Sequence, residues 1–118
     1  MLEEWKDIIG YEGRYQVSSL GRVKSCSHIG WQGKPINEKI LRHYDHHGYD
    51  VVFLYTKETK GKLKRKFLVH VLVGTAFCPR KPEHTQVNHK FKNRKDNRAT
   101  ELEWCTFMEN IVHRDTVF

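Results

Sequence analysis

The last third of the chain constrains the fold most, because four short elements follow one another there with little chain between them. Their expected order is a strand at residues 85–90, a polar loop at 91–100, a strand at 102–104 and a helix at 107–114. Thr106 stands in the N-cap position of that helix, and Glu109 follows three residues later, which is the pattern of a capping box. These residues therefore predict one compact strand–loop–strand–helix unit.

The middle of the chain predicts a β-hairpin followed by a helix. Tyr49–Tyr55 alternates with a period of two, which is typical of a strand, and Lys64–Leu68 is expected to return antiparallel to it across a polar turn at 57–62. Val69–Phe77 carries apolar residues at helical spacing, and Pro79 ends that pattern. We therefore expect a helix directly before the strand–loop–strand–helix unit.

The first part of the chain predicts short strands at Tyr15–Ser18, 22–25 and 39–44, after an opening turn or short helix. We therefore expect an α+β protein. Its N-terminal module, residues 1–50, would be mainly antiparallel β. Residues 51–118 would hold the hairpin, the first helix and the strand–loop–strand–helix core.

The charge of the chain is concentrated in its second half. The formal net charge is +7, with a pI near 9.4. Residues 1–50 carry seven basic and seven acidic side chains, whereas residues 51–118 carry fourteen basic and seven acidic ones. A surplus of this size favours a polyanionic partner, and nucleic acid is the usual one for such a protein. A solvated basic face without a partner is the alternative.

The cysteines point away from a disulfide framework. Cys26, Cys78 and Cys105 are odd in number, lie far apart and form no CxxC pair, so a four-cysteine zinc site is not expected either. The chain shows no signal-peptide pattern and no long apolar run, and we expect a reduced, cytoplasmic setting.

Two sets of motifs carry a family resemblance. The first is Val87-Asn88-His89, Asp96-Asn97-Arg98, Leu102-Glu103-Trp104-Cys105-Thr106 and Glu109-Asn110-Ile111-Val112-His113. This set resembles the HNH homing endonucleases of phages and introns. The second is Glu4-Trp5-Lys6-Asp7-Ile8, Gly10-Tyr11-Glu12-Gly13, Val17-Ser18 and Gly21-Arg22-Val23-Lys24-Ser25. It resembles NUMOD4, a module found in front of such nucleases.

The resemblance implies a ββα-metal (HNH) nuclease core and a metal-dependent DNA endonuclease, located in the host cell cytoplasm if phage-encoded. By position, His89 matches the general base, and Asn88 and Asn110 match metal ligands. Glu101 falls where the family has its central Asn. A histidine near neutral pH can take a proton from water. Amide oxygens suit one Mg²⁺ or Mn²⁺ ion better than Zn²⁺.

Glu101 departs from the family pattern, because an ionised carboxylate only accepts hydrogen bonds whereas Asn also donates them. We expect a functional Glu101, which either accepts a bond from His89 or reaches the metal; weakened or lost catalysis is the alternative. His113 lies three residues after Asn110 on the same helical face, as a further metal ligand, a phosphate contact or a surface residue.

Basic side chains in both halves are candidates for phosphate contacts. They are Arg22, Lys24, Lys64, Arg65, Lys66, Lys92, Arg94, Lys95 and Arg98. The expected partner is double-stranded DNA. The oligomeric state is open, with a homodimer as one alternative. Two other functions fit the same residues: a DNA-binding module with a decayed site, and an RNA-directed binder or nuclease.

Overall fold

The computed structural model describes residues 2–55 and 63–115, and the expected turn at 57–62 lies outside them. In chain order the elements are β1 (Trp5–Asp7), β2 (Tyr15–Ser18), β3 (Val23–Ser25), β4 (His28–Ile29), η1 (Trp31–Gly33), β5 (Pro35–Ile36), β6 (Lys39–Ile40), β7 (Tyr44–His46), β8 (Tyr49–Tyr55), β9 (Lys64–Leu68), α1 (Val69–Phe77), β10 (Gln86–His89), η3 (Ala99–Glu101), β11 (Leu102–Cys105) and α2 (Phe107–Asp115). The mixed α+β class expected from the sequence is confirmed.

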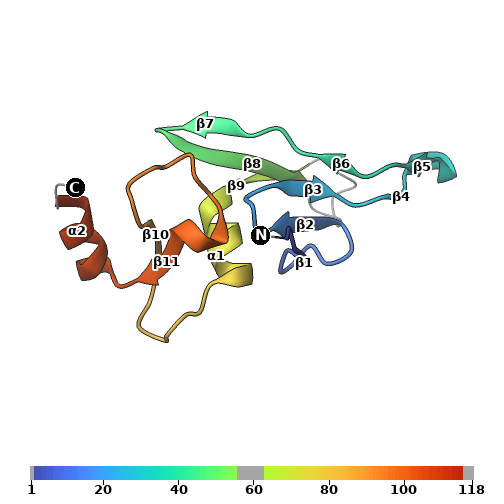
Figure 1. The fold of residues 1–118 in the computed structure, drawn as a ribbon. Helices are drawn as coiled ribbons and strands as arrows, with labels where there is room; N and C mark the ends of the chain where they lie inside the picture. Colours follow the sequence, from blue (N-terminus) through green and yellow to red (C-terminus); the bar gives the residue numbers. More distant parts are fainter. Residues whose placement is uncertain (1, 56–62, 116–118) are drawn as a thin grey trace.

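Helix α1 occupies the centre of the molecule (Figure 1). It contacts β2, β8 and β9 of the N-terminal sheets and also β10, β11 and η3 of the C-terminal unit. Its apolar face, with Val69 and Val73 fully buried, forms one core with Val17, Val52 and Leu102. The division expected between residues 50 and 51 falls within β8, and core side chains come from both sides of it.

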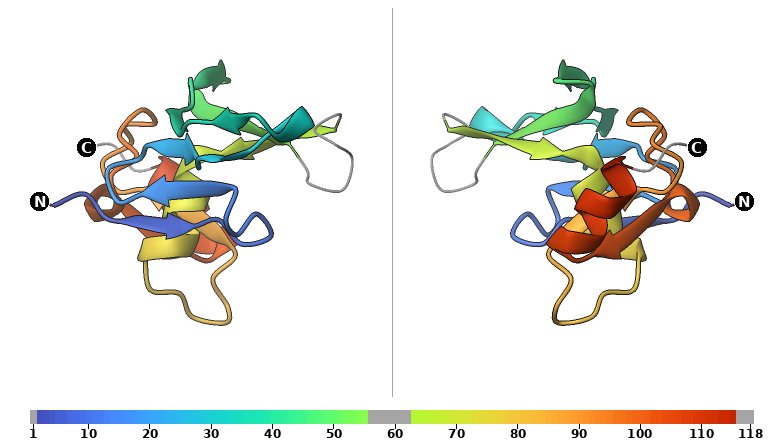
Figure 2. Two further views of the ribbon diagram at one scale, coloured as in Figure 1. Left: turned by 90° about the vertical axis from the view of Figure 1, so that its right-hand side faces the viewer. Right: turned by 90° about the vertical axis from the view of Figure 1, so that its left-hand side faces the viewer.

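The strands between Trp5 and Leu68 form antiparallel sheets with the orders β1-β2-β3-β6, β4-β5 and β7-β8-β9. Helical or turn structure was expected before Tyr15, whereas Trp5–Asp7 forms the strand β1 and pairs with β2. This strand has only three residues, so its own pattern cannot reveal it, and its partner supplies the ladder. Figure 2 shows the β7-β8-β9 sheet above the first sheet and α1.

The C-terminal unit is the expected strand–loop–strand–helix arrangement. Strands β10 and β11 are antiparallel, with Asn88 opposite Glu103, and α2 follows β11. The capping box is confirmed, because the Glu109 N–H donates to Thr106 Oγ1 at 3.1 Å and the Thr106 N–H donates to a Glu109 carboxylate oxygen at 2.9 Å. In the described part of the chain, neither helix has the length and apolar character needed to cross a membrane.

The contact between α1 and β10 is tight enough to test by substitution. A Cβ on Gly74 would lie 2.8 Å from Val87 Cγ2, and the Gly74 carbonyl accepts the Trp104 indole N–H at 2.9 Å. We predict that Gly74→Ala lowers the free energy of unfolding by about 1 kcal/mol or more, because overpacking exceeds the gain in helix propensity.

Urea unfolding measures this change, and Thr75→Ala is the matched control. Thr75 is the next residue of α1 and is exposed, so its replacement should leave the free energy of unfolding unchanged or raise it by a few tenths of a kcal/mol, on the order of the propensity difference. Equal stabilisation by both variants would contradict the tight α1–β10 contact.

Buried His70 of α1 predicts acid-sensitive stability. Its ring is only 6% exposed, and burial together with the nearby His89 lowers its pKa from 6.5 to about 4. The unfolded chain therefore binds a proton more readily than the folded one between these two pH values. The contribution of His70 is present above pH 6.5 and is lost as the pH falls toward about 4, to a limit on the order of 3 kcal/mol.

The His70→Phe variant removes this titration and keeps a flat ring in the same place. Urea unfolding at intervals from about pH 7.5 to about pH 4.5 should show a smaller loss of stability in the variant than in the parent. Parallel curves for the two proteins would mean that His70 is not held neutral by the fold.

Candidate active site

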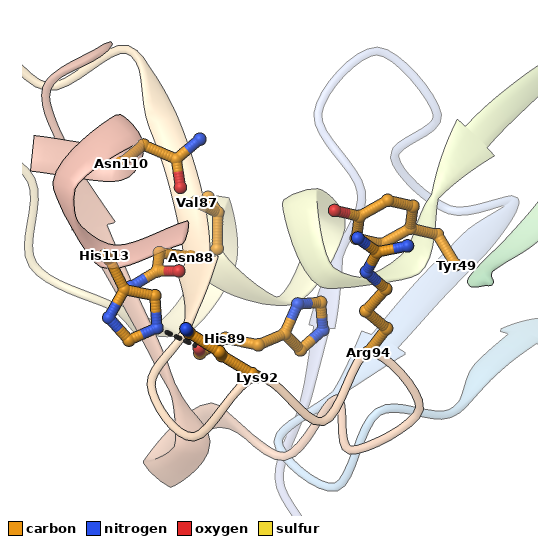
Figure 3. A pocket seen from close by; sticks show the side chains of 8 residues that line it. All are labelled: Tyr49, Val87, Asn88, His89, Lys92, Arg94, Asn110 and His113. Carbon is orange, nitrogen blue, oxygen red and sulfur yellow. Dashed lines mark hydrogen bonds between the residues drawn. The ribbon is translucent and has the colours of Figure 1, made fainter. Parts of the chain in front are cut away.

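A pocket of about 200 Å³ opens where the β10–β11 hairpin, α2 and the start of β8 meet. Eight side chains line it: Tyr49, Val87, Asn88, His89, Lys92, Arg94, Asn110 and His113 (Figure 3). Seven of them come from residues 87–113, whereas Tyr49 comes from β8. The predicted base and the predicted amide ligands are therefore brought together in one place.

Both asparagine side chains are held through their nitrogen atoms. Asn88 Nδ2 donates to a Glu103 carboxylate oxygen at 3.1 Å across the β10–β11 ladder, and Asn110 Nδ2 donates to Gln86 Oε1. With the nitrogens engaged, the carbonyl oxygen of each amide is the atom left to bind a cation. Figure 3 shows the two amides at the same end of the pocket, one on β10 and one on α2.

The His89 ring is buried and oriented by side chains from other segments. Its Nε2 lies 3.1 Å from Asn97 Oδ1, and Asn97 Nδ2 donates to Asp50 Oδ2 at 3.0 Å. Burial lowers the pKa of His89, and the bond to Asn97 and the charge of Asp96 partly oppose that effect. The ring is therefore neutral near pH 7, which is the state a general base requires.

Two aromatic side chains pack beside His89. The His70 ring centroid lies 4.7 Å from that of His89, and the Tyr49 centroid lies 6.0 Å from it. Tyr49 also stacks on His70 at 5.2 Å and carries the Arg94 guanidinium 4.7 Å from its centroid. These contacts restrict the ring of His89 on the side away from α2, as Figure 3 shows for Tyr49 and Arg94.

His113 connects α2 to the end of β10. Its Nε2 lies 3.0 Å from the backbone oxygen of His89 and donates to it, so the lone pair of the neutral ring is on Nδ1. Figure 3 shows His113 beside Asn88, on the same side of the pocket as Asn110. The expected placement of His113 and Asn110 on one helical face is thus present in the structure.

The expected contact between Glu101 and His89 is absent from the described part of the chain. Glu101 ends η3, lies outside the pocket lining, and its carboxylate is 3.4 Å from the Arg98 guanidinium. Asn97 takes the position beside the ring instead. The motif Asp96-Asn97-Arg98 had marked this residue without assigning it a role. Nothing in the sequence pointed to Asp50, which is 47 residues away.

Several of the predicted phosphate-contacting side chains are paired with carboxylates. Arg22 Nε donates to Glu3 at 2.8 Å, and Lys24 lies 3.2 Å from Glu38. Lys95 forms ion pairs with both Asp45 and Asp50. Arg98 makes a bidentate contact with the Asp96 carboxylate. Lys64, Arg65 and Lys66 lie exposed along β9, and Lys92 and Arg94 line the pocket.

The chemistry of the donor atoms decides which metal fits. Among the described residues, no group of three or more His, Cys, Asp or Glu side chains comes together as a metal site. The pocket instead offers the amide oxygens of Asn88 and Asn110. Mg²⁺ keeps several water ligands and takes phosphate oxygens from its substrate, so two neutral oxygens fit Mg²⁺ or Mn²⁺ and do not fit a structural Zn²⁺.

Comparisons with known proteins agree with this arrangement. The NUMOD4 motif model matches residues 3–55. The DNA endonuclease I-HmuI of Bacillus phage SP01 is 39% identical over 111 residues, which cover 94% of this chain and 57% of that protein. An uncharacterized HNH endonuclease of Acanthamoeba polyphaga mimivirus is 36% identical over 115 residues, covering 94% of this chain and 26% of its own length.

A solved structure, described as DNA binding and cleavage by the HNH homing endonuclease I-HmuI, superposes with a TM-score of 0.72 and 38% identity. The match covers 98% of this chain and 61% of that one. The chain thus spans little more than half the length of its I-HmuI relative. The chain is thus similar to the HNH homing endonuclease I-HmuI, and it carries a NUMOD4 motif in residues 3–55.

Proposed function

We propose that this chain is a metal-dependent DNA endonuclease in which His89 is the general base and Asn88 and Asn110 hold one Mg²⁺ or Mn²⁺ ion. The observation that carries the proposal is the pocket in which a buried, neutral histidine lies next to two amides whose nitrogens are already engaged. The relation to I-HmuI, for which DNA binding and cleavage are described, supports the same reaction.

His89 would accept the proton of the attacking water at Nδ1, because Nε2 faces Asn97. Asn97 and the packed ring of His70 keep the imidazole in place. His113 holds α2, and with it Asn110, against the backbone of His89. The divalent ion would stabilise negative charge on the scissile phosphate and on the leaving 3′-oxygen.

Glu101 has a structural role in this proposal, since its carboxylate faces Arg98. Glu103 acts on the metal site indirectly: its carboxylate accepts the Asn88 amide N–H and orients that amide, so that the carbonyl oxygen can serve as a ligand. His113, which lines the same pocket, is a further candidate ligand.

We propose that duplex DNA is bound mainly by the exposed β9 cations Lys64, Arg65 and Lys66 and by Lys92 and Arg94 at the pocket. Arg22, Lys24, Lys95 and Arg98 would contribute less, because DNA must first displace their carboxylate partners. The homodimer considered from the sequence stays a prediction, which sedimentation velocity would test.

Cleavage of supercoiled plasmid tests the reaction and its base. With Mg²⁺ or Mn²⁺ the parent should nick the plasmid, and a chelator should stop the reaction. His89→Ala should lower the rate by roughly 10²–10⁴-fold while DNA binding is retained. His28→Ala is the control, because His28 contacts the backbone of Cys26 in the N-terminal half, and it should cut like the parent.

Two results would contradict the proposal. If the parent binds DNA but cuts with no metal, the chain is a DNA-binding module with a decayed site. If RNA competes DNA away at equal length and salt, the substrate is RNA.

The salt dependence of DNA binding tests the assignment of the phosphate contacts. The triple variant Lys64→Gln, Arg65→Gln and Lys66→Gln should reduce the slope of log K against log salt by about 2–3. The matched triple Arg22→Gln, Lys24→Gln and Arg98→Gln removes the same charge and should reduce the slope by less than about 1. Fluorescence anisotropy over a salt series measures both. Equal reductions would mean that the paired cations bind phosphate as well as β9 does.

A further inference from the structure

We propose that Asp50 is a positioning residue for the base: through Asn97 it determines which nitrogen of the His89 ring carries the lone pair. Asp50 lies on β8, outside the strand–loop–strand–helix unit, and no motif of the sequence marks it. The inference rests on the proposed function, since it concerns the orientation of the proposed base.

The carboxylate of Asp50 determines the direction of the Asn97 amide. Ionised Asp50 only accepts hydrogen bonds, so the Asn97 atom 3.0 Å from its Oδ2 must be the amide nitrogen. Asn97 is only 5% exposed, and reversing its amide would put two acceptors against each other without water to separate them. The charge of Asp50 therefore fixes the direction of the Asn97 side chain.

The direction of the amide then fixes the proton on the histidine. With its nitrogen toward Asp50, Asn97 presents Oδ1 to the ring, 3.1 Å from His89 Nε2. An amide oxygen only accepts, so Nε2 carries the hydrogen and Nδ1 of the neutral ring carries the lone pair. A reversed amide would present its nitrogen, and the lone pair would then lie on Nε2, facing Asn97 instead of the attacking water.

Asp50 is itself fixed by the groups around it. Lys95 Nζ donates to Asp50 at 2.9 Å and to Asp45 at 2.6 Å, and His43 Nδ1 lies 3.5 Å from the Asp50 carboxylate. Asp45 and Asp50 are cross-strand partners on β7 and β8. The Lys95 bridge joins this hairpin to the loop that carries Asn97, so the two side chains stay within hydrogen-bonding distance.

The backbone of Asn97 is held from the other side by the β2–β3 turn. A Cβ on Gly21 would lie 2.9 Å from Asn97 Cβ and 3.0 Å from its carbonyl oxygen, and the Ala99 N–H donates to the Ser19 carbonyl at 2.8 Å. Asn97 therefore fits between two segments of the N-terminal half. That half, which includes the NUMOD4 motif, thus positions the base in addition to any contact with DNA.

Asp50→Asn and Asp45→Asn form a matched pair of variants. Each removes one carboxylate from Lys95, but only Asp50 contacts Asn97. An asparagine at position 50 can present either its oxygen or its nitrogen, so the amide of Asn97 loses its fixed direction. The double variant Asp50→Asn/Asn97→Asp exchanges the two groups: the new carboxylate at position 97 accepts from both sides and again requires a hydrogen on Nε2.

The experiment uses two measurements on the full chain. Long-range ¹H–¹⁵N correlation NMR identifies the tautomer of the His89 ring, and plasmid nicking with Mg²⁺ gives the rate. We expect Asp45→Asn to keep the Nε2–H tautomer and to cut within about threefold of the parent. Asp50→Asn should show a mixture of tautomers and a rate lower by roughly 10–100-fold. The double variant should recover the Nε2–H tautomer and part of the rate.

A merely structural role for Asp50 predicts different results. If Asp50→Asn keeps the Nε2–H tautomer, the proposal is overturned, whether the rate falls or not. If Asp45→Asn changes the tautomer as much as Asp50→Asn does, the effect comes from Lys95 and the proposal is overturned as well. The tautomer can be measured in a chain that cuts no DNA, so this test is separate from the test of the nuclease activity.

Discussion

Burial of polar side chains is the constraint on which the site depends. Asn88, His89 and Asn97 are each at most 8% exposed, and a buried polar group without a partner costs about 1–3 kcal/mol. Each of them has a partner from another segment: Glu103, Asn97 and Asp50 respectively. Because these partners differ in whether they donate or accept, they determine the direction of the Asn88 and Asn97 amides and of the His89 ring. These buried hydrogen bonds therefore fix the orientation of the side chains in the site and also contribute to the stability of the fold.

The two halves of the chain share one core and are also joined by polar contacts near the base. Helix α1 packs on the N-terminal sheets and on the β10–β11 hairpin. In the loop after β10, Lys95 binds Asp45 of β7 and Arg94 binds the backbone oxygen of His47 in the β7–β8 turn. The base is therefore held by residues from both halves. The basic side chains also fall into two groups. Four of the predicted phosphate contacts, Arg22, Lys24, Lys95 and Arg98, are paired with carboxylates, whereas the β9 cations are exposed.

Sequence patterns predicted those features that depend on local chemistry. The bounds of Tyr49–Tyr55 and Val69–Phe77 follow from periodicity. Lys64–Leu68 follows from its place as the return strand of the hairpin, and the start of α2 follows from its capping box. The pocket residues Asn88, His89 and Asn110 were found through a family motif. Glu101 was expected to contact His89 or the metal because it falls where the HNH family has its central Asn. That correspondence does not tell which way the side chain points, and in the structure Asn97 lies beside the ring while Glu101 faces Arg98. The partner Asp50 depends on tertiary packing across 47 residues, for which a single sequence carries no signal.

The central claim is that His89 Nδ1 and the carbonyl oxygens of Asn88 and Asn110 face one reacting phosphate. A crystal structure of the chain with duplex DNA and Mn²⁺, with anomalous diffraction to locate the metal, tests it most directly. We expect one Mn²⁺ bound by the two amide oxygens and a phosphate oxygen, with a water near His89 Nδ1. A metal bound elsewhere, or a DNA backbone that bypasses this pocket, would contradict it.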